Sequence, residues 1–108
     1  MSSKAYFAHP MRTYGTPKEA EVILSLQEYG WELINPKDYN VQARKLTDKC
    51  GGGWLPCGIC KKGVMKPLFY RLIKECEVFI HWNPLGTCGV ECETVEAQRL
   101  GKTIHYIT

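Results

Sequence analysis

The sequence contains no long apolar run, no strong excess of one charge, no internal repeat and no linker-like segment. The apolar stretch Ala5–Ala8 is followed at once by Pro10 and Arg12, so it is too short for a signal peptide or a membrane span. A net charge of +3 without a Lys/Arg stripe argues against a nucleic-acid partner. These absences predict one cytoplasmic domain over residues 1–108, with neither a membrane nor a nucleic acid as partner.

The composition is otherwise that of an ordinary globular domain. Hydrophobic residues make up 44% of the 108 residues and charged residues 23%, which is enough for a modest core. The six cysteines are below the density of a disulfide scaffold, and a reducing compartment would keep them as thiols or metal ligands.

Apolar periodicity and breaker residues predict alternating strands and helices. The expected strands are 4–8, 31–34, 77–82 and 102–107, and the expected helices are 17–29, a polar segment 37–49, 64–76 with Pro67 in its first turn, and about 90–100. The first helix has a capping box from Thr16 to Glu19, a buried face at Val22, Ile23, Leu26 and Tyr29, and a stop at Gly30.

This alternation is typical of a flavodoxin-like α/β domain with about four parallel strands and helices on both faces. Ligands of such domains bind outside the carboxyl ends of the strands. The loops that end there are 9–15 and 83–89, so we expect the functional residues in and beside them.

The second loop combines glycines with the start of a helix. Backbone N–H groups at a helix start form an anion site, to which Thr87 can add a hydroxyl. The helix dipole favours an ionised Glu93, and a carboxylate beside an anion pocket suits a nucleophile that attacks a sugar C1′. The alternative is that Thr87 is a simple helix cap and that Glu91 and Glu93 are solvated acids.

Several motifs, in this order and spacing, resemble the nucleoside 2-deoxyribosyltransferase-like superfamily over most of the chain. They are Tyr6–Met11, Asn35-Pro36, Cys76–Phe79, Gly89–Glu93, Ala97 and Gly101-Lys102. The resemblance implies that Glu93 is the nucleophile, that Tyr6 supports it, and that Glu77 is the acid before the third strand. It also implies a site built across a homodimer.

The closest branch is that of the 2′-deoxynucleoside 5′-phosphate N-hydrolases. Its members carry an arginine in the first loop and a hydroxyl residue six positions before the nucleophile, and Arg12 and Thr87 match these positions. The resemblance implies that Arg12, Thr87 and the N–H groups of Cys88 and Gly89 hold a 5′-phosphate. Glu77 or Glu91 would then protonate the leaving base or handle water.

His9 and the cysteine-rich segment depart from the family pattern. His9 replaces part of a usual Gly-containing pair, and it either touches the phosphate or base or is a partly exposed loop residue. His81 and His105 fall in strands and are expected to be structural. Residues 50–63 form an irregular insert whose CxxC pair, Cys57 and Cys60, can join Cys50 at a structural zinc or an iron–sulfur cluster. The alternative is a lid of free thiols.

The sequence therefore predicts hydrolysis or transfer at the N-glycosidic bond of a nucleoside 5′-monophosphate, with no cofactor required for catalysis. Two other classes of function stay open. One is a nucleotide-binding or sensing module without turnover, which the substituted pair His9-Pro10 and the missing counterpart of the family's fifth strand favour. The other is a metal-stabilised protein-interaction domain.

Overall fold

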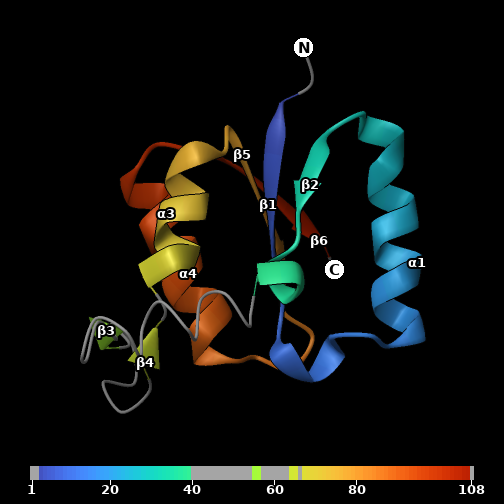
Figure 1. The fold of residues 1–108 in the computed structure, drawn as a ribbon, viewed down its shortest axis with the longest axis horizontal. Coiled ribbons are helices and arrows are strands. Elements are labelled where there is room, and N and C mark those ends of the chain that lie inside the picture. The colour runs from blue at the N-terminus through green and yellow to red at the C-terminus, as the bar shows by residue number, and fades with distance from the viewer. Residues whose placement is uncertain (1–2, 40–54, 57–63, 66, 108) are drawn as a thin grey trace.

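The computed structural model describes residues 3–39, 55–56, 64–65 and 67–107 and forms a parallel sheet between helices (Figure 1). The main elements are β1 Lys4–Ala8, α1 Pro17–Leu26, β2 Glu32–Ile34, α3 Pro67–Glu75, β5 Val78–Trp82, α4 Cys88–Arg99 and β6 Thr103–Ile107. The four-stranded sheet has the order β2-β1-β5-β6, and every neighbouring pair is parallel. The predicted flavodoxin-like α/β class is confirmed.

The two central strands, β1 and β5, are buried on both faces, as strands of a parallel sheet usually are. On one face, Phe7 and Ile80 pack with Val22 and Leu26 of α1. On the other, Tyr6 packs with a cluster contributed by α3, α4 and β5: Phe69, Ile73, Val90, Ala97 and Phe79. Figure 1 shows α1 on one side of the sheet and α3 and α4 on the other. Successive side chains of β1 therefore pack into the two different core layers, one on each face of the sheet.

The first helix begins as the sequence predicts. Thr16 is the N-cap residue, and its hydroxyl oxygen accepts the backbone N–H of Glu19 at 3.2 Å. The helix ends at Leu26, a 3-10 turn η2 (Gln27–Tyr29) follows, and Gly30 closes it in the left-handed conformation with φ 72°. The prediction that Tyr29 is buried was wrong, because η2 turns its ring outward, where it stacks on Trp31 at 4.6 Å.

Loss of the Thr16 cap should destabilise the fold measurably. Thr16→Ala removes the acceptor for the Glu19 N–H and should lower the free energy of unfolding by about 1–2 kcal/mol. Urea denaturation followed by circular dichroism measures this change. Thr16→Ser keeps the hydroxyl and should stay near wild type; equal losses in both variants would contradict a capping role.

Two helix boundaries differ from expectation. Residues 64 and 65 were predicted to open a helix, but they form β4 (Val64–Met65), which pairs antiparallel with β3 (Leu55–Pro56). The helix α3 begins at Pro67 instead, since a proline lacks the N–H that the first helical position leaves unpaired anyway. The last helix, α4, begins two residues earlier than predicted, at Cys88.

Some sequence predictions fall wholly or partly outside the described residues. Residues 36–39 are helical, and the rest of the polar helix predicted over 37–49 lies beyond them. Most of the insert 50–63 also lies outside. Among the helices of the described ranges, none has the length and apolar character needed to cross a bilayer.

Candidate functional site

The carboxyl ends of β1 and β5 lie side by side and carry the two loops that the sequence points to. Ala8 pairs with His81 in the sheet register, so the first loop and the loop after Trp82 start next to one another. The first loop contains a 3-10 turn, η1 (Met11–Thr13), on which Arg12 is exposed. The second loop leads into α4 through Thr87.

Glu93 and Tyr6 meet beneath these loops. Glu93 lies in the second turn of α4 and is 8% exposed, and Tyr6, in the middle of β1, is fully buried. Both the Tyr6 hydroxyl oxygen and Oε2 of Glu93 are buried. Burial, followed by the negative charge of Glu93, raises the pKa of Tyr6 well above its ordinary value. The phenol therefore stays neutral, next to the carboxylate that the resemblance assigns as nucleophile.

Two more tyrosines, which the sequence reasoning missed, belong to the same neighbourhood. Burial, then the charge of Glu93, then that of Glu19 raise the pKa of Tyr14 in the first loop. Burial, then a side-chain hydrogen bond with the buried Cys92, then more weakly the charge of Glu93 raise the pKa of Tyr70 in α3. The charge of Glu93 thus acts on neutral phenols from β1, the first loop and α3. No periodic sequence signal marks Tyr14 or Tyr70, because only the fold brings them to Glu93.

Asn83 organises the second loop. Its Oδ1 accepts the backbone N–H of Thr87 at 2.9 Å and the Thr87 hydroxyl at 3.3 Å, and its Nδ2 donates to the Thr87 carbonyl at 3.1 Å. Thr87 occupies the N-cap position, but its side chain makes no capping hydrogen bond to α4. Asn83 therefore fixes the loop, and the first N–H groups of α4, at Cys88 and Gly89, begin directly behind Thr87.

Glu91 is tied to β5 and to the same loop. Its Oε1 accepts from Asn83 Nδ2 at 2.9 Å and lies 2.9 Å from Nε2 of His81. These hydrogen bonds, that of His81 first, lower the pKa of Glu91. An ionised Glu91 is a poor proton donor, so in this arrangement it serves better as a partner of His81 than as the acid for a leaving base.

Two other residues predicted for the site, Glu77 and His9, bind elsewhere and do not contribute to the group around Glu93. Glu77 Oε2 accepts the backbone N–H of Lys4 at 2.7 Å, at the amino edge of the sheet, roughly 13 Å along β1 from the first loop. His9 is buried, with Nδ1 facing the Phe7 carbonyl and Nε2 facing Glu19. Neither ring nitrogen of His9 is open to a phosphate in this arrangement.

The described residues hold no cluster of three or more His, Cys, Asp or Glu side chains that suits a metal ion. Cys50, Cys57 and Cys60, the metal ligands predicted from the sequence, lie outside the described ranges. Of the cysteines in the described ranges, Cys76 and Cys92 are buried and Cys88 is partly buried, and none of these three forms a disulfide.

A shallow cavity of about 430 Å³ lies between α3 and α4, away from the two loops. It is lined by Tyr70, Arg71, Lys74, Glu96, Arg99 and Leu100. Two of its lining residues, Tyr70 and Glu96, also lie near Glu93. We therefore locate the candidate site by the converging side chains at the carboxyl edge and not by this cavity.

No protein-family model, no curated protein and no solved structure matches this chain. What the protein does must therefore be inferred from its own residues and from the family that its motifs resemble.

Proposed function

We propose that this protein cleaves, or transfers across, the N-glycosidic bond of a nucleoside 5′-monophosphate, with Glu93 as the nucleophile. The observation that carries the proposal is the meeting of Glu93 with Tyr6, both buried, below the two loops that leave the carboxyl edge of the sheet. These are the two residues that the family resemblance pairs, and residues 87 apart in sequence meet only through the fold.

The chemistry runs in two steps. A Glu93 carboxylate oxygen bonds to C1′ as the C1′–N bond breaks, and the base leaves with the bond electrons and takes up a proton. Water, or a second base, then bonds to C1′ and gives up a proton, and the ester to Glu93 breaks to restore the carboxylate. The products of hydrolysis are the free base and the sugar phosphate.

The leaving base needs a proton donor at this edge. Glu77 is at the other edge of the sheet, and the hydrogen bonds to Glu91 keep it ionised. His81 lies near the carboxyl end of β5, where its Nε2 is 2.9 Å from Oε1 of Glu91. We assign the proton transfer to His81, with Glu91 holding its ring.

The phosphate would lie between the two loops. Arg12 is exposed on the first loop, and the N–H groups in the first turn of a helix point out of its amino end, where they favour an anion. Together with the Thr87 hydroxyl, they form a cationic and N–H-rich edge that suits a 5′-phosphate dianion.

Base release tests the proposal. Purified protein would be incubated with a panel of ribo- and deoxynucleoside 5′-monophosphates and the matching nucleosides, and free base followed by chromatography. We expect release from monophosphates and much less from nucleosides. If a folded protein binds a monophosphate but releases no base from the whole panel, the protein is a nucleotide-binding module and the glycosidase proposal fails.

Arg12 should matter only for phosphorylated substrates. Arg12→Ala removes a charge-assisted hydrogen bond and should raise KM for the monophosphate about 10- to 100-fold. Its effect on the slow release from the matching nucleoside should be small. An equal loss on both substrates would mean that Arg12 supports the loop and does not bind the phosphate.

A further inference from the structure

His9 and Glu19 form a buried polar pair between the first loop and α1. His9 Nε2 lies 2.6 Å from Glu19 Oε2, and His9 Nδ1 lies 2.8 Å from the Phe7 carbonyl oxygen. The two residues are 4% and 3% exposed. Ring centroids of Phe7, Tyr14 and Trp82 lie 4.0, 4.9 and 5.9 Å from that of the imidazole. A polar pair buried this deeply needs all of its hydrogen bonds.

The contacts of this pair fix how many protons it holds. The Phe7 carbonyl can only accept a hydrogen bond, and so can an ionised Glu19 carboxylate. The two short contacts of the His9 ring therefore need two protons within the pair. Either the imidazole carries both and faces a carboxylate, or the imidazole carries one at Nδ1 and a protonated Glu19 donates to Nε2. Both arrangements have a net charge of zero.

The surroundings favour neither arrangement alone. Burial lowers the pKa of His9, which favours the proton on the carboxyl oxygen. Burial works to raise the pKa of Glu19, but the Gly15 N–H, His9 and Lys37 outweigh it and lower that pKa, which favours the proton on the ring. The arrangements differ only by the movement of one proton along the 2.6 Å contact.

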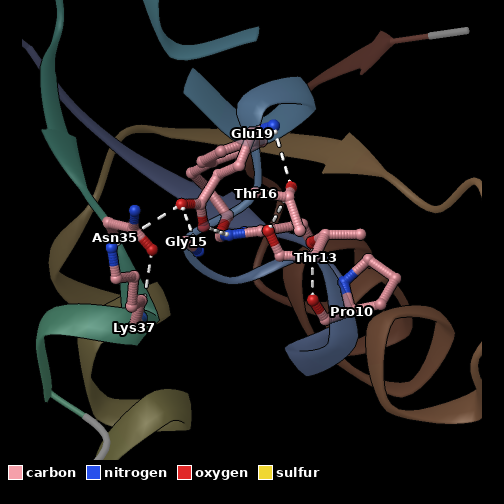
Figure 2. Close-up of polar contacts among 9 residues, drawn as sticks. Pro10, Thr13, Gly15, Thr16, Glu19, Asn35 and Lys37 are labelled. Carbon is pink, nitrogen blue, oxygen red and sulfur yellow. Dashed lines mark hydrogen bonds and ion pairs between the residues drawn. The ribbon is translucent and has the colours of Figure 1, made fainter. Parts of the chain in front are cut away.

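Glu19 also holds the far end of the first loop. Its Oε1 accepts the Gly15 N–H at 3.0 Å and lies 3.8 Å from Nζ of Lys37, which follows β2. Gly15 has φ 75°, a conformation that favours glycine. Figure 2 shows Glu19 between Gly15 of this loop and Lys37. One carboxyl group thus joins the His9 end of the loop to the Gly15 end.

Of the residues between these ends, Tyr14 lies near enough to the candidate site for the charge of Glu93 to raise its pKa. Tyr14 precedes Gly15, its ring lies against that of His9, and it neighbours both Glu93 and Glu19. Hydrogen bonds inside the loop, from Thr13 Oγ1 to the Pro10 carbonyl at 2.6 Å and from Tyr14 N–H to the Met11 carbonyl at 3.1 Å, give it one compact shape. Fixing both ends therefore fixes where Arg12 and Tyr14 lie.

We propose that His9 and Glu19, sharing two protons, are positioning residues that hold the first loop so that Tyr14 faces Glu93 and Arg12 faces the substrate phosphate. Neither residue touches the reacting atoms. The part of this proposal that concerns turnover rests on the proposed function, whereas the part that concerns the loop does not.

Two substitutions at Glu19 test the proposal. In Glu19→Gln, the amide oxygen can accept the Gly15 N–H while the amide N–H donates to His9 Nε2, so the neutral amide reproduces the protonated carboxyl group. Glu19→Leu keeps the size and removes every polar contact. We expect hydrogen exchange of the Gly15 amide, followed by NMR, to speed up at least about tenfold in the leucine variant and to stay near wild type in the glutamine variant.

The rate of base release should also be lowered by Glu19→Leu and largely kept by Glu19→Gln. Base release by Glu19→Leu should fall about 10- to 100-fold, mostly in kcat, since a misplaced group costs about this much, and Glu19→Gln should restore it to within about threefold of wild type. Glu21→Gln and Glu21→Leu, at an exposed position of the same helix, control for effects on α1 and should change neither readout.

The results distinguish failure of the positioning role from failure of the proposed function. If Glu19→Leu keeps slow exchange at Gly15, or if Glu19→Gln is as damaged as Glu19→Leu, the positioning role is wrong. If the wild type releases no base from any monophosphate, the proposed function fails, and the Gly15 amide still reports whether the pair holds the loop.

Discussion

Replacing Glu93 by glutamine should lower base release by about 10⁴-fold or more, because loss of a nucleophile removes the covalent route altogether. Glutamine is nearly isosteric with glutamate, so the packing around Tyr6 should be kept. The amide cannot carry the negative charge that attacks C1′. Initial rates on the best monophosphate of the panel measure the loss, and calorimetric titration checks that the nucleotide still binds.

A carboxylate elsewhere on α4 gives a matched control for this loss. Glu96 lies nearly one turn further along the helix than Glu93, and it pairs with Arg99. Glu96→Gln should retain base release close to wild type. Similar losses in the two variants would mean that helix charge, and not a nucleophile, supports the activity.

Trapping of the intermediate distinguishes nucleophilic attack from simple electrostatic help. Acid quenching during turnover should yield a fraction of protein that is heavier by the sugar phosphate, with the mass on the peptide that contains Glu93. If Glu93→Gln keeps full activity and no adduct forms, water attacks C1′ directly and Glu93 is not the nucleophile.

The strands and their order could be predicted because local patterns report them well. In β1 and β5, runs of apolar residues bounded by breakers mark buried parallel strands, and Thr16 with Pro17 marks the start of α1. The helix boundary near residue 64 was predicted wrongly, because the same residues fit both a helical and a strand pattern. The apolar residues 64–65 fit the periodicity of a helix, but they precede a proline start and pair with residues 55–56.

Only some residues of the candidate site could be predicted from the sequence. The motifs around Tyr6 and Glu93 carry the family resemblance, and the fold brings these two residues together. Tyr14 and Glu19 have no comparable signal, since Glu19 looks like an ordinary capping-box acid until its burial against His9 is known. Glu77 fits a motif in sequence, but its position before β5 places it at the amino edge. Contacts between distant segments decide these roles.

The largest effect on stability is expected at Phe79, where the core and the candidate site meet. Phe79 is fully buried in β5, opposite Tyr6 in the sheet register, and the two rings stack with centroids 5.7 Å apart. Phe79→Ala should lower the free energy of unfolding by about 3–5 kcal/mol, because it loses buried surface and leaves a cavity. Domains of this size are stable by only about 5–15 kcal/mol, so a large share of the stability would go.

Urea denaturation measures this loss, with Val95→Ala as the control. Val95 is an exposed apolar residue of α4, and its truncation should change stability by no more than about 0.5 kcal/mol. A cost near that value at Phe79 would mean that the core between the sheet and α4 is not packed as described. The Tyr6 ring loses its stacking partner in Phe79→Ala, so base release should fall even under conditions where the variant is fully folded. We therefore expect stability and base release to be coupled at this position, because the residue that fills the core also stacks on the phenol beside Glu93.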